Sequence, residues 1–149
     1  MVIDQRNSIV LKQLRNSQKI SREKLSADAL LKNRKLVLDL NRKQMRLGIN
    51  AVGDLFRPYS IPYWEFKRTL PTYKASDGIP DLFLRGHFQT NMNLTVSGDQ
   101  YNIDSTVPHA EKLKRKYNPI FGLSGEYDKE AETKITIDYN RLYHQELNK

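Results

Sequence analysis

The clearest hydrophobic pattern lies between residues 86 and 105, where apolar and polar side chains alternate. The inward positions would be Phe88, Thr90, Met92, Leu94 and Val96, then Tyr101 and Ile103 after the tight connection Ser97-Gly98-Asp99. Alternation with a period of two is typical of strands that bury one face, and a short polar connection joins two such strands. The pattern therefore predicts a β-hairpin.

Apolar residues at helical spacing predict helices before the hairpin. In residues 5–25 a short stripe of Ile9, Val10 and Leu14 is surrounded by long polar side chains. A helix with so narrow an apolar face is marginal alone in water.

A second, stronger helix follows in the sequence. Ser26 or Asp28 would cap its start, and Gly48 would stop it after about Leu47. Leu30 and Val37 lie among its inward positions, whereas basic side chains cover much of the remaining surface.

Shorter elements are expected around and after the hairpin. We expect short helices at 62–69 and 108–116, each beginning at a proline. Residues 126–147 predict a last helix, although three consecutive β-branched residues make a strand at 133–139 the competing interpretation. The expected fold is α+β, with long N-terminal helices packed on a small antiparallel sheet, a central β-hairpin and short C-terminal helices.

Composition excludes several classes of protein. The chain has 149 residues, no cysteine and a net charge of +8. Without cysteine there is no disulfide framework and no thiolate zinc site. No apolar run is long enough to cross a membrane, and the N-terminus lacks the apolar stretch of a signal peptide. We expect synthesis in a cytoplasm.

The charge is concentrated at one end of the chain. Residues 1–50 carry 12 basic and 4 acidic side chains, whereas residues 51–149 carry 13 of each. Such asymmetry indicates a basic arm on a neutral body. We therefore expect a helical arm at 1–26 and a single α+β domain at 27–149.

The basic side chains have two functional interpretations and one structural one. They would neutralise phosphates of a nucleic acid without reading its bases, or contact an acidic protein surface, or simply form a solvated helix face. The candidate contact residues are Arg6, Lys12, Arg15, Lys19, Arg22, Lys24, Lys32, Arg34, Lys35, Arg42, Lys43 and Arg46.

Nothing in the sequence indicates an enzyme. The three histidines, His87, His109 and His144, have no metal-ligand spacing, and no phosphate loop or nucleophile motif occurs. The acidic residues near 126–132 fit the start of a helix, whose dipole they complement. We expect no catalytic residue, no metal and no cofactor; a metal-dependent nuclease is the weakest of the alternatives.

Aromatic residues gather between 59 and 73, where a binding surface or a core role is possible. Together with the hairpin they supply the candidate interface residues, which are Tyr63, Trp64, Phe88, Met92, Leu94, Tyr101 and Ile103.

Residues 82–92 and 98–105 resemble a pattern of tailed-phage neck proteins. In that pattern a Leu-x-x-(Thr)-Gly-x-(aromatic or Leu)-x-x-Ser segment leads into a hairpin, and a Ser-x-x-Pro-(Tyr/His)-Ala segment follows, as at residues 105–110 here. The family is the head-to-tail connector, or tail-completion, group of virion morphogenesis proteins. Parts of residues 40–67 and residues 117–123 are also similar to small proteins of Bacteroidetes phages, including crAss-like phages.

The resemblance implies a structural virion protein that acts by assembly. Such proteins form rings, often of six or twelve copies, which join the portal and neck to the tail and help to seal the DNA channel. The implied partners are copies of this chain, portal and other neck or tail proteins, and packaged DNA as a non-specific contact, with no membrane. The implied location is the virion, after assembly in the host cytoplasm. The alternative is a nucleic-acid-binding module that acts through residues 1–50.

Overall fold

The computed structural model describes residues 5–75, 77–98 and 100–149, and side chains only from residue 9 onward. Within these ranges it contains seven helices and one two-stranded antiparallel sheet, so the fold is α+β as predicted. In chain order the elements are α1 (Gln5–Lys19), α2 (Arg22–Lys32), α3 (Arg34–Arg46), α4 (Ile61–Lys67), α5 (His87–Thr90), β1 (Met92–Ser97), β2 (Gln100–Ser105), α6 (Ala110–Tyr117) and α7 (Gly125–Leu147).

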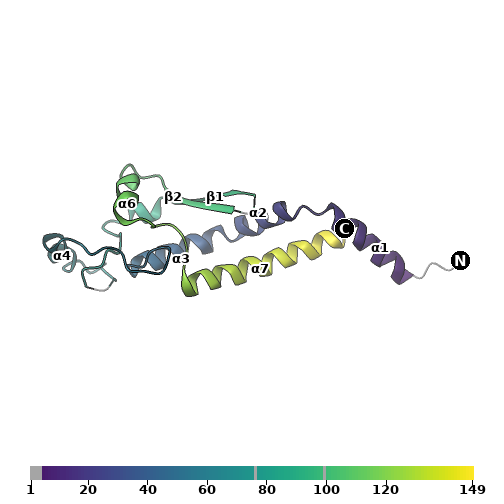
Figure 1. The fold of residues 1–149 in the computed structure, drawn as a ribbon, viewed down its shortest axis with the longest axis horizontal. Helices are drawn as coiled ribbons and strands as arrows, with labels where there is room; N and C mark the ends of the chain where they lie inside the picture. Colours follow the sequence, from purple (N-terminus) through teal and green to yellow (C-terminus); the bar gives the residue numbers. More distant parts are fainter. Residues whose placement is uncertain (1–4, 76, 99) are drawn as a thin grey trace.

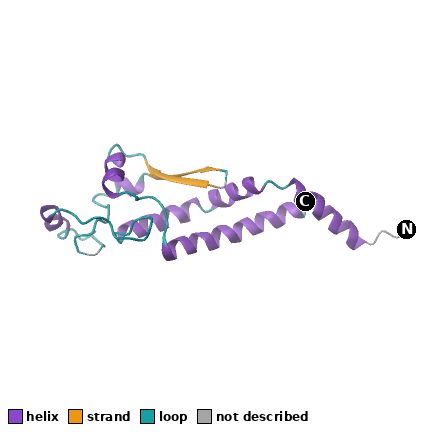
Figure 2. Cartoon of the chain, in the orientation of Figure 1, coloured by secondary structure: helices purple, strands orange, loops and turns teal. Residues whose placement is uncertain are grey.

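The molecule is elongated, and its middle is built in layers (Figure 1). Helices α2 and α3 follow one another along the long axis, with α7 beside them in the opposite direction and the β-hairpin on their other side. Helix α1 extends from one end, and α4 lies at the other (Figure 2). The α2–α3 pair is therefore the layer that joins the sheet to α7.

The predicted long helix divides into α2 and α3, and its start was placed too late. Ser21 is the N-cap of α2, because its hydroxyl accepts a hydrogen bond from the Lys24 backbone N–H at 3.3 Å. The division falls at Asn33, whose side-chain amide donates to the Ala29 carbonyl at 2.9 Å. Since α2 begins at Arg22, it crosses the boundary expected at residue 26.

Gly48 ends the helical layer as predicted. Its φ of 78° lies in the left-handed region that favours glycine. A Cβ at this position would lie only 2.3 Å from Cγ2 of Ile79. The glycine is therefore required both by backbone conformation and by the close approach of a distant loop.

The hairpin pairs Met92 with Ser105 at its base and Ser97 with Gln100 at its tip, and Asp99 lies outside the described residues. The first strand is shorter than predicted, because residues 87–90 form helix α5. The Thr90 N–H donates to the Gly86 carbonyl at 2.8 Å, which closes this turn. Apolar alternation before residue 92 therefore reflects a helical turn that buries Phe88, not a strand.

The last helix is the longest element, so the C-terminal helices are not all short. Helix α7 spans 23 residues and packs against α2, α3 and α1. The β-branched residues 135–137 lie within this helix, so the alternative prediction of a strand at 133–139 is wrong. Long-range packing on α2 overrides the local preference of these residues. The short helices α4 and α6 lie close to their predicted positions.

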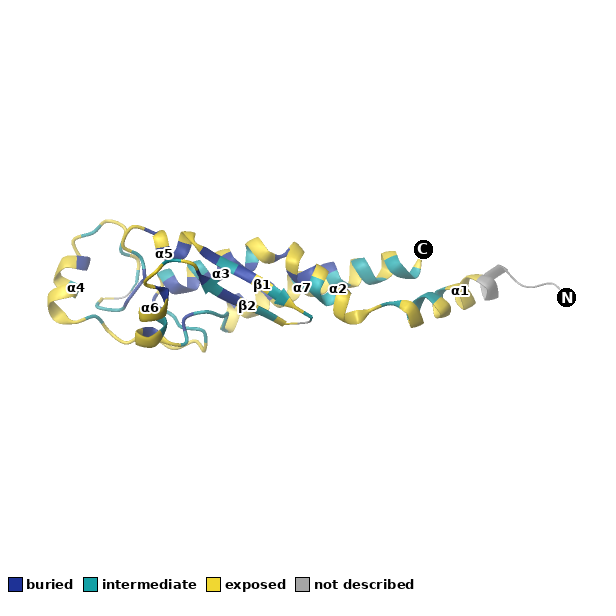
Figure 3. Cartoon of the chain, turned by 90° about the horizontal axis from the view of Figure 1, so that it is seen from above, coloured by how far each residue is buried: buried dark blue, intermediate teal, exposed yellow. Residues whose placement is uncertain are grey.

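The core lies where the sheet, α3 and the first half of α7 meet (Figure 3). The Phe88 ring stacks on Phe121 with centroids 5.7 Å apart. Two buried amide side chains of α3 form hydrogen bonds with the loop before α7. Asn41 donates to the Gly122 carbonyl at 2.8 Å, and Gln44 accepts from the Ser124 N–H at 2.9 Å. This core positions both ends of the molecule.

Candidate functional site

Helix α1 presents an apolar face to solvent. Val10, Leu11 and Leu14 lie on one side of the helix at about 100° per residue, and they are 52%, 53% and 55% exposed. An amphipathic helix of a globular protein normally turns its apolar side to its own core. In this chain the apolar side of α1 is left open, and Figure 3 shows no buried residue along the described part of this helix.

The side of α1 that faces its own chain is polar. Gln13 donates to the Asn148 side-chain carbonyl at 3.3 Å, and Asn16 donates to the Leu147 backbone carbonyl at 3.0 Å. These contacts join α1 to the end of α7 without burying its aliphatic residues. The arm is thus held in place by hydrogen bonds, which contribute about 1 kcal/mol each.

The cations of the arm form no ion pair with a carboxylate in the part of the chain that the structure describes. We call Lys12, Arg15, Lys19, Arg22 and Lys24 the arm cations; all five are exposed. No ion pair in the described part of the chain involves any of them. The Arg6 side chain lies outside the described residues.

Several cations farther along have structural roles instead. Arg42 donates from Nε to the Gln89 carbonyl at 2.8 Å and pairs with Asp39 at 2.7 Å. The Arg46 guanidinium lies 3.8 Å from the centroid of the Phe83 ring, a favourable cation–π contact. Their charge serves to hold α3 against neighbouring segments.

Of the other basic candidates in α3, two contact groups within the chain and one does not. Arg34 hydrogen-bonds the Asn93 side chain on β1, and the Lys43 ammonium lies 5.6 Å from the centroid of the Tyr127 ring. Lys35 is exposed and has no ion pair among the described residues.

Lys32 belongs to a charge cluster around a buried carboxylate on α7. Its Nζ lies 3.1 Å from Asp138, and Lys134 and Arg141 lie 3.3 and 3.4 Å from the same carboxylate. The Asn33 amide, which donates at 2.9 Å, and then the ammonium groups of Lys32 and Lys134 hold the pKa of Asp138 well below its ordinary value. The cluster joins α2 to α7.

The hairpin candidates lie mostly inside the protein. Phe88, Met92, Leu94 and Ile103 are between 2% and 5% exposed and belong to the core. Tyr101 is half-buried against the same core. Met92, Leu94 and Ile103 therefore stabilise the fold from within the core, and Phe88 does the same while lining the pocket described below.

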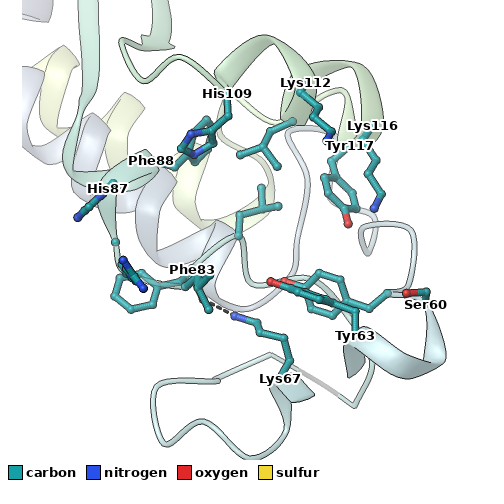
Figure 4. Close-up of a pocket in the computed structure, with 16 residues that line it drawn as sticks. Ser60, Tyr63, Lys67, Phe83, His87, Phe88, His109, Lys112, Lys116 and Tyr117 are labelled. Carbon is teal, nitrogen blue, oxygen red and sulfur yellow. Dashed lines mark hydrogen bonds between the residues drawn. The ribbon is translucent and has the colours of Figure 1, made fainter. Parts of the chain in front are cut away.

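The two aromatic candidates on α4 have different surroundings. Trp64 packs on Tyr73 with centroids 5.0 Å apart, whereas Tyr63 is 38% exposed and lines a pocket. This pocket, of about 540 Å³, lies between α4, residues 82–88 and α6 (Figure 4). We call it the α4–α6 pocket.

One wall of the α4–α6 pocket contains a buried ion pair. The Lys67 ammonium lies 2.8 Å from Asp81, and both side chains are at most 1% exposed. Lys67 also donates to the Phe83 carbonyl (Figure 4). The Tyr59 hydroxyl donates to Asp81 at 3.3 Å. Burial, and then the Asp81 charge, raise the pKa of Tyr59, so its hydroxyl stays protonated.

The sequence by itself does not predict this pocket. Its residues come from three segments that are distant in the chain, 59–67, 82–88 and 109–117, and no motif joins them. Two signals reached it in part: the aromatic density at 59–73, of which Tyr59 and Tyr63 line the pocket, and the interface candidate Phe88, which is buried in its wall. Lys67 gave no signal, because a lysine at the end of a short helix is ordinarily solvated.

The described residues hold no group of three or more histidine, aspartate and glutamate side chains placed to bind a metal ion. Over the same residues, no helix combines the length and apolar character needed to cross a membrane. No family model, curated protein or solved structure matches the chain.

Proposed function

We propose that the chain is a structural virion protein of the head-to-tail interface of a tailed phage. It self-assembles into a ring that joins the portal and neck to the tail and helps to seal the DNA channel. The observation that carries the proposal is helix α1, which leaves the body with its apolar side exposed and its polar side against α7.

An exposed aliphatic face on a projecting helix favours a role in assembly. Isolated helices of about 15 residues are marginal in water, and their packing supplies most of their stability. The aliphatic side chains of α1 that the structure describes stay more than half exposed, so we propose that a neighbouring subunit or a neck protein covers them. Rings arise when one face of a subunit binds a different face of the next copy.

The test is particle assembly with and without an intact arm. Leu14→Asp would leave the monomer folded, because this side chain is 55% exposed, but would abolish incorporation into particles. The matched control is Ile137→Asp on α7, where the side chain is 48% exposed. Particles that lack the protein should lose DNA or fail to join tails; normal particles would overturn the proposal.

The arm cations favour a second function, contact with nucleic acid. Lys12, Arg15 and Lys19 lie within one side of α1 and have no carboxylate partner in the described part of the chain. Such a contact would weaken steeply with salt, with a slope that falls by about 1 for each phosphate contact removed. The test compares DNA-duplex binding by the full chain and by the triple variant Lys12→Gln, Arg15→Gln, Lys19→Gln over a range of salt concentrations. Equal salt dependence of the two affinities would exclude a nucleic-acid contact by these cations.

A further inference from the structure

We infer that the α4–α6 pocket binds an acidic peptide segment of a partner protein, one that carries a bulky apolar side chain between its carboxylates. The source of such a segment is a neighbouring virion protein, and in that respect alone the inference rests on the proposed function. The pocket lies at the opposite end of the molecule from α1 and so defines a second, separate contact (Figure 1).

The charges around the pocket are all of one sign once the buried ion pair is discounted. Asp81 neutralises Lys67, which leaves three cations that line the pocket: Arg85 in the segment 82–88, and Lys112 and Lys116 on α6. Figure 4 labels the two lysines. These three side chains are exposed and form no ion pair among the described residues. Among the residues that the structure describes, no aspartate or glutamate lines the pocket.

The interior of the pocket is apolar. Leu82 and Phe88 are buried in its wall, Leu113 is half-buried, and Leu84 is 49% exposed beside Arg85. A volume of about 540 Å³ is ample for one large side chain with part of its backbone. Apolar walls with cations at the rim complement a ligand whose apolar group is flanked by negative charges.

The aromatic rings of the pocket favour a peptide over a nucleic acid. Stacking of a base requires an open ring face. Phe83 is covered by the Arg46 guanidinium at 3.8 Å, and Phe88 is covered by Phe121 at 5.7 Å. Tyr63, which is exposed, packs edge to face on Tyr59 with ring centroids 4.8 Å apart. Two of the rings thus have a covered face, and the aliphatic part of the wall suits an apolar side chain of a protein.

The binding test uses the full chain and a short fluorescein-labelled peptide of Glu and Gly that flank a central Leu-Phe pair. Two control peptides replace either the acids by Gln or the Leu-Phe pair by Ser. We expect the first peptide alone to bind with saturable anisotropy and to shift the methyl resonances of Leu84 and Leu113. Equal binding of the Gln peptide, absence of binding, or shifts confined to another surface would overturn the inference.

Variants of the protein locate the contact. The double variant Lys112→Gln, Lys116→Gln is expected to weaken binding roughly tenfold, because it removes two charge-assisted contacts. Leu84→Ser should weaken it through the apolar wall, at a site exposed enough to leave the fold intact. The matched control is Arg15→Gln, Lys19→Gln, which removes two cations at the same spacing on α1 and should leave peptide affinity unchanged.

A single-stranded oligonucleotide serves as the competitor. If it displaces the peptide and shifts the same methyl groups, the pocket binds nucleic acid and the inference is wrong. This experiment is independent of particle assembly. If the peptide does not bind but particle assembly still requires an intact α1, the inference about the pocket is wrong and the proposed function stands. If the peptide binds but the protein is absent from particles, the proposed function is wrong and the pocket inference stands.

Discussion

Helices α1 and α3 both come from the basic first third of the chain, but their surroundings give them different roles. The apolar side of α3 is buried under the sheet and α7, with Val37 and Met45 at 0% exposure, and Arg42 and Arg46 bind neighbouring segments. The apolar side of α1 is open, and its cations are unpaired among the described residues. Similar composition therefore supports an internal role in one helix and leaves the other available for a partner.

The largest expected contrast is the loss of one apolar side chain from each helix. Met45→Ala should lower the free energy of unfolding by about 2–5 kcal/mol, because it leaves a cavity in the core. Leu14→Ala should change it by less than about 0.5 kcal/mol, since the side chain is exposed. Urea unfolding of both variants measures the contrast, and equal losses would mean that α1 is part of the same core.

Gly48 tests how firmly the end of α3 is fixed by distant packing. Gly48→Ala should cost about 2–4 kcal/mol, the sum of a left-handed backbone penalty and a clash with Ile79. Gly78→Ala is the control, because its φ of 77° is similar but no atom lies within 4 Å of its Cβ position. It should cost only about 1–2 kcal/mol. If the two variants are equally unstable in thermal and urea unfolding, the contact with Ile79 has no effect.

A smaller contrast concerns the cations. Arg42→Gln should lower the free energy of unfolding by about 1–2 kcal/mol, because it removes the donor to the partly buried Gln89 carbonyl. Arg15→Gln should leave stability within about 0.5 kcal/mol of the wild type. Urea unfolding of both variants at the same ionic strength measures the difference. A large loss of unfolding free energy for Arg15→Gln would mean that Arg15 has a structural partner in the folded chain.

The smallest effect should appear in acid, at the junction of α2 and α7. The pKa of Asp138 lies below its ordinary value of 3.8, so its stabilising charge is fully present well above that value and is lost progressively as pH falls through 3.8 toward the lower pKa of the folded state. Its cationic partners are about half exposed, which lets water screen the pairs.

The variant Asp138→Asn keeps the shape of the side chain and removes this charge. The stability difference between wild type and variant should therefore shrink from about pH 7 to about pH 3. Urea midpoints across this range measure it. A difference that stays constant with pH would assign the contribution of Asp138 to its shape and hydrogen bond alone.

Several features of the fold followed from the sequence. Periodicity predicted the helical first third, the hairpin and the last helix, and Gly48 marked the end of α3. The start of α2 was misplaced because Ser21, Ser26 and Asp28 are all chemically competent caps. The first strand was drawn too long because an alternating pattern also fits a short helical turn at residues 87–90.

The candidate site was less accessible to sequence reasoning. The arm cations were named, but so were Lys32, Arg42 and Arg46, which bind groups within their own chain. A basic side chain looks the same in either role, because its partner is a carboxylate, a carbonyl or a ring elsewhere in the chain. The α4–α6 pocket does not follow from the sequence because its walls come from three segments that only folding brings together.

By itself the sequence determined local quantities: which segments are helical, which alternate, and where positive charge accumulates. These depend on residues a few positions apart, whose spacing on a helix or strand is fixed. Only the tertiary structure decided which apolar faces are covered, which cations are neutralised, and that the Lys67–Asp81 pair is buried beside a pocket. Burial and pairing depend on residues from distant segments, and that proximity exists only once the chain has folded.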